Sequence, residues 1–92
     1  MHFEWDEEKN QKNKKKHELD FETAIQCWED QNGFDVWDKR HSTSTEDRWI
    51  RFGRLPKGKV ICVVYTEVSE TLCRIISAFS DKKIEDLYYE YK

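Results

Sequence analysis

The sequence has little cysteine, glycine or proline and no long apolar run. Its three cysteines, Cys27, Cys62 and Cys73, show no CxxC spacing, which favours reduced thiols over a disulfide framework or a zinc site. No stretch approaches the ~18 apolar residues of a membrane span, and the residues after Met1 do not read as a secretory signal. We therefore expect a cytoplasmic protein with no metal site and no membrane partner.

Sequence motifs that code for common chemistries are also missing. There is no P-loop, GxGxxG, HExxH or GxSxG pattern, and 92 residues leave room for one domain, residues 1–92, without a separate cofactor domain. We expect no cofactor. The formal net charge of -3 excludes a uniformly basic protein that coats nucleic acid, although a local basic surface remains compatible with it.

What the chain does have is aromatic residues. Four Trp, five Phe and four Tyr argue against disorder despite a mean hydropathy of -0.99, so a few large rings must supply most of the core. A chain this small does not bury them all. We expect an exposed patch that binds a protein partner and includes some of Trp28, Trp37 and Trp49.

Periodicity predicts the elements. Residues 2–5 form a candidate strand, and residues 6–18 lack any hydrophobic side chain, so they form a solvated helix held by its ends or a mobile arm. Asp20 is a candidate cap for an amphipathic helix over residues 21–30. Four strands are expected at 34–38, 48–54, 60–65 and 71–79, and a last helix at 82–91. The fold class is α+β: a small antiparallel sheet of four to five strands flanked by three helices, in the order β-α-α-β-β-β-β-α.

Four polar features are candidates for function. Lys9 to His17 is either a solvated helix face or a phosphate-binding surface. On strand alternation, Arg48 and Arg54 share one face of their strand and Arg51 lies on the other. Arg74 lies in an apolar strand, with Leu72, Ile76 and Ala78 expected on its face, and needs a partner: Glu67, Glu85 or a ligand anion. The loop 38–46 contributes His41 and Glu46. Together these residue types supply the base, the acid and the cations that RNA cleavage requires.

A family resemblance extends over nearly the whole chain. Phe3-Glu4-Trp5-Asp6, then Lys9, Asn13, Lys16-His17, Leu19, Phe21 and Ala24, resembles the signature FEWDxxKxxxNxxKHGhxFxxA of BrnT toxins, where h is apolar. Later elements resemble that family's motifs in the same order: His41, Glu46 and Arg48, Gly53, Val64-Tyr65-Thr66-Glu67, Arg74-Ile75-Ile76-Ser77-Ala78, and Glu85 with Tyr89.

The resemblance implies a RelE-like toxin of a type II toxin–antitoxin system, which cleaves RNA without a cofactor and arrests translation. It also implies a BrnA-like ribbon-helix-helix antitoxin, a heterotetramer with that antitoxin, and contact with operator DNA only through it. By carry-over, Arg48 and Arg74 would hold the scissile phosphate. His41 and Glu46 are the first acid–base candidates, and Lys16, His17 and Tyr65 the second ones. The expected RNA-binding residues are Lys9, Lys16, His17, Arg51, Lys82 and Lys83.

Two positions depart from the family pattern. Glu18 replaces the glycine of KHG, and Phe79 replaces the second arginine expected after Ile76-Ser77-Ala78. Loss of a phosphate-stabilising donor costs roughly 10²–10³ in rate, although Lys82 or Lys83 is close enough in sequence to compensate. Two alternatives therefore stay open: a catalytically weakened homologue that binds the antitoxin as a co-repressor, and an RNA-binding domain without activity.

Overall fold

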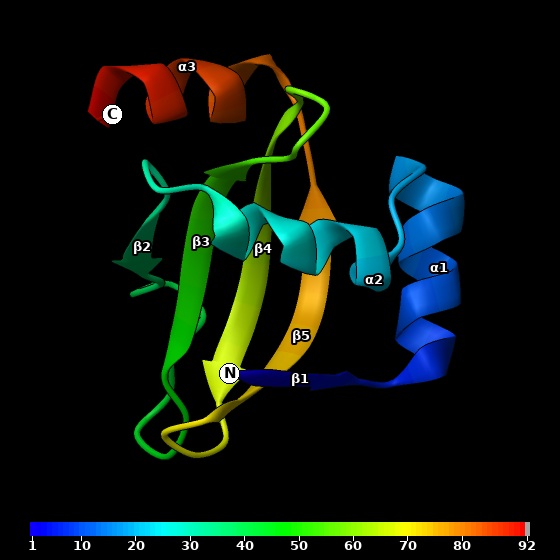
Figure 1. Cartoon of the computed structure of the whole chain (residues 1–92). Coiled ribbons are helices and arrows are strands. Elements are labelled where there is room, and N and C mark those ends of the chain that lie inside the picture. The colour runs from blue at the N-terminus through cyan, green and yellow to red at the C-terminus, as the bar shows by residue number, and fades with distance from the viewer. Residues whose placement is uncertain (92) are drawn as a thin grey trace.

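Five strands form one sheet in the order β1-β5-β4-β3-β2 (Figure 1) in the computed structural model, which describes residues 1–91. The strands are β1 (His2–Trp5), β2 (Phe34–Trp37), β3 (Arg48–Arg54), β4 (Val60–Glu67) and β5 (Leu72–Phe79), and the helices are α1 (Glu7–His17), α2 (Phe21–Ala24), the 3-10 helix η1 (Ile25–Glu29) and α3 (Lys82–Tyr91). The predicted α+β class and element order are confirmed. Among residues 1–91, no helix has both the length and the apolar composition needed to cross a bilayer.

One strand differs in direction from the predicted antiparallel sheet. Strands β2 to β5 pair antiparallel, whereas β1 pairs parallel to β5. Most of the chain separates β1 from β5, so no tight turn dictates an antiparallel direction between them. The sheet is therefore mixed, and α1 starts where β1 ends at the β5 side of the sheet (Figure 1).

Helix α1 is attached through buried asparagines, which corrects the expectation that it is held by its ends. The side-chain amide of Asn13 donates to the carbonyl oxygens of Leu19 and Ala78, each at 2.8 Å, and its Oδ1 accepts from the Ala78 amide at 3.1 Å. Asn10 Oδ1 accepts from the Phe21 amide. A helix without an apolar face therefore packs on the sheet through side-chain hydrogen bonds to the backbone groups of its neighbours.

The turn between α1 and α2 contains the departure at Glu18. This residue caps α1 in the left-handed region, with φ 56° and ψ 33°, and its amide donates to the Lys14 carbonyl. It is the one non-glycine residue with positive φ among residues 1–91. Replacement of the family's glycine thus leaves the turn in place but puts a side chain where glycine is favoured.

The amphipathic helix after Asp20 forms as predicted and packs closely on the sheet. Asp20 Oδ1 accepts from the Thr23 amide at 2.7 Å, and the helix continues into η1. A Cβ at Gly53 would lie 2.7 Å from the Cys27 carbonyl oxygen, so η1 rests directly on β3 where only glycine fits. We call the sheet face covered by α2 and η1 the helical face, and the opposite one the open face.

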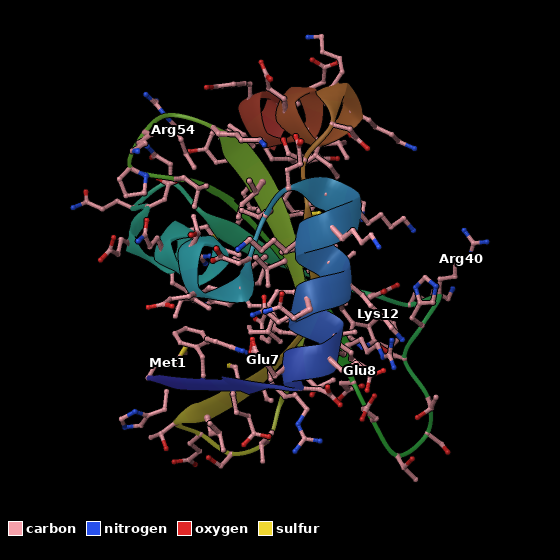
Figure 2. The ribbon with its side chains drawn as sticks, turned by 90° about the vertical axis from the view of Figure 1, so that its right-hand side faces the viewer. Met1, Glu7, Glu8, Lys12, Arg40 and Arg54 are labelled. Atoms are coloured by element: carbon pink, nitrogen blue, oxygen red, sulfur yellow. The ribbon has the colours of Figure 1, made fainter. Side chains whose placement is uncertain are left out.

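Two cores result. On the helical face, Phe21, Ala24 and Cys27 are fully buried against the centre of the sheet. On the open face, α3 packs Ile84 and Tyr88 onto one end of the sheet. Figure 2 views the sheet from its α1 side, with α2 on one side and the loop that carries Arg40 on the other. The end of the open face near that loop is therefore left without a helix.

A β-bulge decides which side chains of β5 reach this uncovered end. Val64 pairs with Ser77 and Tyr65 with Ile75, so Ile76 is the extra residue. As a result Ala78 is buried in the helical-face core with Ile75, and Arg74 lies on the open face. The expectation that Arg74 and Ala78 share a face is wrong, because side chains of a strand alternate between the two faces only until a bulge inserts a residue.

Candidate active site

Four residues form a line across the open face. Arg48 of β3 pairs with Thr66 of β4, Thr66 with Arg74 of β5, and Arg74 with Glu4 of β1. We call these four residues the arginine row. Neighbouring strands lie ~4.8 Å apart, so the two arginine backbones are separated by about 10 Å, with the buried Thr66 between them. Long side chains at this separation can converge on one anion.

Both arginines have a carboxylate partner and remain accessible. Arg74 contacts Glu4 Oε2 through Nε at 2.6 Å and Nη2 at 2.5 Å, and its side chain is 60% exposed. The partner is thus Glu4 and neither Glu67 nor Glu85. Arg48 donates only Nε to Glu46, at 3.3 Å. Within residues 1–91 nothing occupies its terminal nitrogens, which leaves them available to a phosphate oxygen.

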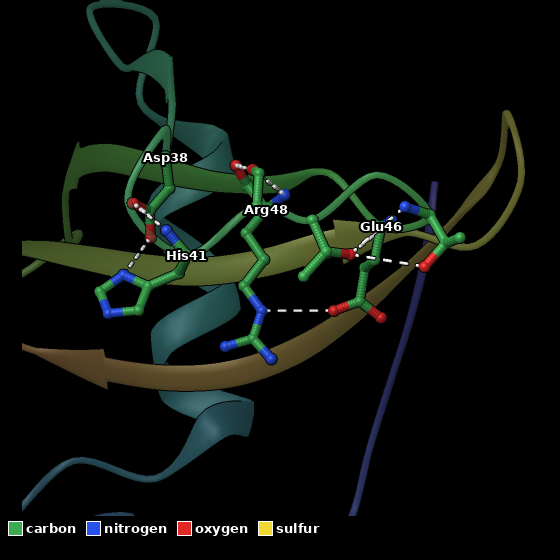
Figure 3. A network of polar contacts seen from close by, with 7 residues as sticks. Asp38, His41, Glu46 and Arg48 are labelled. Atoms are coloured by element: carbon green, nitrogen blue, oxygen red, sulfur yellow. Dashed lines mark hydrogen bonds and ion pairs between the residues drawn. The ribbon is translucent and has the colours of Figure 1, made fainter.

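The loop between β2 and β3 presents His41 beside this row. Asp38 is buried, and its carboxylate accepts from the His41 amide at 3.2 Å and meets His41 Nδ1 at 2.9 Å (Figure 3). The imidazole is otherwise exposed. Sequence reasoning missed Asp38, although an Asp in a loop commonly accepts from a backbone amide shortly after it in the chain.

Further hydrogen bonds fix the loop to β3. The Arg48 amide donates to Ser42 Oγ at 2.9 Å, and the Glu46 amide donates to Thr43 Oγ1 at 3.0 Å. The hydroxylated residues of the loop therefore hold its backbone. Figure 3 shows the consequence: His41 and Glu46 lie on opposite sides of the Arg48 side chain.

Two hollows adjoin Arg74. One of about 400 Å³ is lined by residues including Glu46, Trp49 and Thr66, and one of about 310 Å³ by residues including Glu4 and Lys9. Arg74 lines both. An anion bound at Arg74 would thus have room for attached groups on either side.

The expected RNA-binding lysines of α1 connect to this site. Lys9, Lys16 and His17 line a third hollow of about 240 Å³, and Lys9 also lines the hollow that reaches Arg74. Lys82 and Lys83 are exposed at the start of α3, and Lys82 pairs with Asp86. The structure therefore brings Lys9, Lys16 and His17 onto one surface with the arginine row, while Lys82 and Lys83 lie at the end of the sheet that α3 covers.

Arg51 does not belong to this surface. Its side chain is only 12% exposed, pairs with Asp35 at 3.0 Å, and lies over the ring of Trp28. Strand alternation places it on the helical face, as predicted, and there it is enclosed by the packing of η1. At this location Arg51 has structural contacts and lies on the face opposite to the arginine row.

Tyr65, a secondary acid–base candidate, also lies on the helical face. Burial raises the pKa of Tyr65 far above its ordinary value, and the hydrogen bond that its hydroxyl donates to Asp35 at 2.8 Å adds to the shift. The phenol is therefore neutral and is separated from the arginine row by the sheet. Within residues 1–91 no three His, Cys, Asp or Glu side chains are grouped to hold a metal ion.

The three tryptophans do not form one exposed patch. Trp28 packs on Phe3 and Tyr65, with ring centroids 4.8 and 5.1 Å apart, and Trp49 is half-buried against the same core. Trp37 alone is largely exposed, at 47%. Of the three tryptophans, only Trp37 is available for an exposed patch, because the core covers most of the other two rings.

Phe79 lies away from the arginine row. It is half-buried beside the α3 core, and its ring centroid is 5.6 Å from that of His17. Phe79 pairs with Cys62 and Arg74 with Thr66, four residues apart along β4, which corresponds to about 13 Å.

Comparisons with known proteins point to one family. Residues 5–85 match the family described as "Ribonuclease toxin, BrnT, of type II toxin-antitoxin system". None of the curated proteins compared matches the chain. Among solved structures, the chain is similar to the 1.1 Å crystal structure of the Brucella abortus ribonuclease toxin BrnT, with 26% identity and a TM-score of 0.70 over 89% of this chain and 97% of that chain. The chain therefore belongs to the BrnT family of ribonuclease toxins of type II toxin–antitoxin systems.

Proposed function

We propose that this chain is an endoribonuclease toxin that cleaves RNA at the arginine row without a metal ion or cofactor. The observation that carries the proposal is the register that puts Arg48 and Arg74 on the two strands beside Thr66. In the reaction a ribose 2′-oxygen bonds to phosphorus and the bond to the 5′-oxygen breaks. Two guanidinium groups that meet the phosphate oxygens stabilise the charge that builds up on them.

The basic face of α1 is proposed to bind the RNA that leads to this site. Lys9, Lys16 and His17 share the surface that reaches Arg74, which explains how a chain with a net charge of -3 attracts a polyanion locally. Lys82 and Lys83 are proposed to extend the surface beyond His17. Simultaneous alanine substitution of Lys9 and Lys16 should weaken RNA binding and reduce its salt dependence.

The antitoxin that the family implies is proposed to be a BrnA-like ribbon-helix-helix protein. It would form a heterotetramer with the toxin and carry all contact with operator DNA. We propose that it covers the edge strand β2, where Val36 and Trp37 are 44% and 47% exposed. An apolar groove of about 500 Å³, lined by residues that include Val36, Ile50 and Leu87, adjoins this edge.

Trp28 and Trp49 are half-buried and are proposed to contribute less of the antitoxin surface than Trp37. Replacement of Trp37 by Ala should therefore weaken co-purification of toxin and antitoxin more than replacement of either other tryptophan. Equal losses for all three would argue against the β2 edge as the centre of the interface.

A co-repressor without activity is the second candidate function, and Phe79 is the observation that favours it. Its distance of about 13 Å from Arg74 along the sheet weakens this candidate, because an arginine there would not complete the arginine row. An RNA-binding domain without activity would leave the position of His41 and Glu46 beside Arg48 unexplained.

The test is induced expression in a bacterium that lacks the antitoxin, followed by RNA analysis. Cleaved RNA, arrested translation and rescue by the co-expressed antitoxin are expected for a toxin of the cytoplasm. Unimpaired growth and intact RNA, with the protein shown to be folded and abundant, would contradict the proposal.

A further inference from the structure

The acid and base of phosphodiester cleavage must lie on opposite sides of the phosphorus. The 2′-oxygen attacks in line with the leaving 5′-oxygen, so one group must take a proton at the attacking side and another must supply one at the far side. His41 and Glu46 flank the Arg48 side chain (Figure 3). A phosphate held by the terminal nitrogens of Arg48 would therefore have one of these residues on each side.

Glu46 and His41 contact side chains of opposite charge. Glu46 lies 3.3 Å from the Arg48 guanidinium, and a carboxylate that accepts from an arginine can take up a proton but has none to give. His41 faces the carboxylate of Asp38, whose side chain is 9% exposed. Among the described residues Asp38 has no other cationic partner, so its negative charge matches the protonated imidazole.

The contact also fixes which ring nitrogen reacts. Because Nδ1 faces Asp38 Oδ2 at 2.9 Å, it carries a hydrogen, and Nε2 is the ring nitrogen that has no partner among the described residues. A carboxylate behind a histidine holds the ring orientation and the tautomer in this way. The proton for transfer is therefore the one on Nε2.

We infer that Glu46 is the general base and His41 the general acid of the reaction, with Asp38 as the residue that positions His41; this rests on the proposed ribonuclease function. Glu46 removes the 2′-hydroxyl proton as the 2′-oxygen bonds to phosphorus. His41 Nε2 gives its proton to the 5′-oxygen as the P–O5′ bond breaks. The products are a 2′,3′-cyclic phosphate and a 5′-hydroxyl, and exchange of the two protons with water restores the site.

A leaving group that needs no protonation distinguishes the two roles. RNA oligonucleotides with one cleavable linkage are prepared with the normal 5′-oxygen or with a bridging 5′-sulfur, which leaves readily as a thiolate. Wild type, His41→Ala, Glu46→Gln and a control, Glu22→Gln, are compared on both. Glu22 is exposed on α2, on the helical face, so this control removes a carboxylate far from the open face.

The assignment predicts selective rescue. His41→Ala should lose roughly 10²-fold or more on the oxygen linkage and return to within a few-fold of wild type on the sulfur linkage, which also proves that the variant is folded. Glu46→Gln should stay impaired on both, and Glu22→Gln on neither. Rescue of Glu46→Gln in place of His41→Ala, or rescue of neither, overturns the assignment. If wild type cleaves neither substrate, the proposed function itself fails.

The positioning role of Asp38 has a readout that does not depend on activity. Nitrogen NMR of the histidine rings should show the Nδ1-protonated tautomer for neutral His41 in the wild type and a shift towards the other tautomer in Asp38→Asn. The same variant should lose activity on the oxygen linkage and recover on the sulfur linkage. An unchanged His41 tautomer in Asp38→Asn would remove Asp38 from the mechanism.

Discussion

Arg48 and Arg74 stand opposite the same residue, Thr66, from the two strands that flank it. This relationship places two guanidinium groups from positions far apart in sequence on one uncovered end of the sheet. It depends on the bulge at Ile76, because the bulge lets β5 keep Ile75 and Ala78 in the helical-face core while Arg74 lies on the opposite face. The same surface continues through Lys9 to the lysines of α1.

Replacing Phe79 by Arg should leave RNA cleavage within about threefold of the wild type. The side chain lies near His17 and α3, about 13 Å along the sheet from Arg74, so an arginine there adds no donor at the arginine row. The measurement is the cleavage rate of a defined RNA. A gain of two orders of magnitude would instead mean that the wild type is a weakened homologue.

Asn13 should be among the most destabilising positions of α1. Its replacement by Ala removes three hydrogen bonds and leaves backbone groups of Leu19 and Ala78 buried without a partner, which should cost about 3 kcal/mol in the free energy of unfolding. Urea denaturation measures this. The matched control is Lys15→Ala on the exposed side of the helix, with a change below about 0.5 kcal/mol. Equal effects at both positions would contradict the docking of α1 through Asn13.

Glu18→Gly should stabilise the protein. Glu18 has φ 56°, a conformation that costs a residue with a Cβ about 1 kcal/mol and costs glycine nothing. Glycine's greater conformational freedom in the unfolded chain offsets part of this gain. A net gain of about 0.5 kcal/mol in urea denaturation is expected. Glu18→Ala keeps the Cβ and should show no gain. A loss of stability in Glu18→Gly would show that the Glu18 side chain contributes more than the strain costs.

The protein should lose stability in alkali from about pH 9 upward. Burial raises the pKa of the Cys27 and Cys62 thiols to about 12, and burial together with the hydrogen bond to Asp30 raises the pKa of Tyr88 to about 12. Unfolded chains release these protons at about 9 for Cys and 10 for Tyr, so the native state binds more protons between those values and 12. Stability is fully present below pH 9 and falls as the pH rises through this window.

Urea unfolding at a series of pH values tests this expectation. The decline should be shallower above pH 10 in Tyr88→Phe, whereas Tyr91→Phe, at a side chain 69% exposed, should follow the wild type. A free energy of unfolding that stays constant from pH 9 to 12 would contradict it.

Elements whose burial follows from local pattern were predictable from the sequence. The cap at Asp20 and the apolar spacing of Phe21 and Ala24 predict α2, and the apolar run after Val60 predicts the central strand β4. The role of Asn13 was not predictable, because its partners belong to a loop and to a distant strand. A sequence without a hydrophobic stripe gives no sign that its polar side chains are the contacts.

The candidate site was predictable in its residue types and not in its arrangement. His41, Glu46, Arg48 and Arg74 do gather on one face, but the face of Ala78 relative to Arg74 depended on a bulge that alternation does not reveal. Arg51 and Tyr65 lie on the helical face instead, where both contact Asp35 of β2. Asp38 was missed because the sequence does not show that the turn after Asp38 brings its carboxylate to His41.

The most direct test of the account is cleavage of single-stranded RNA by the purified chain in the presence of a chelator. Wild type should produce fragments that end in a 2′,3′-cyclic phosphate. Arg48→Ala and Arg74→Ala should each reduce the rate by roughly 10²–10³, and Arg54→Ala, an exposed arginine on the same strand as Arg48, should not. Cleavage that requires an added metal ion, or that survives the loss of both Arg48 and Arg74, would contradict the central claim.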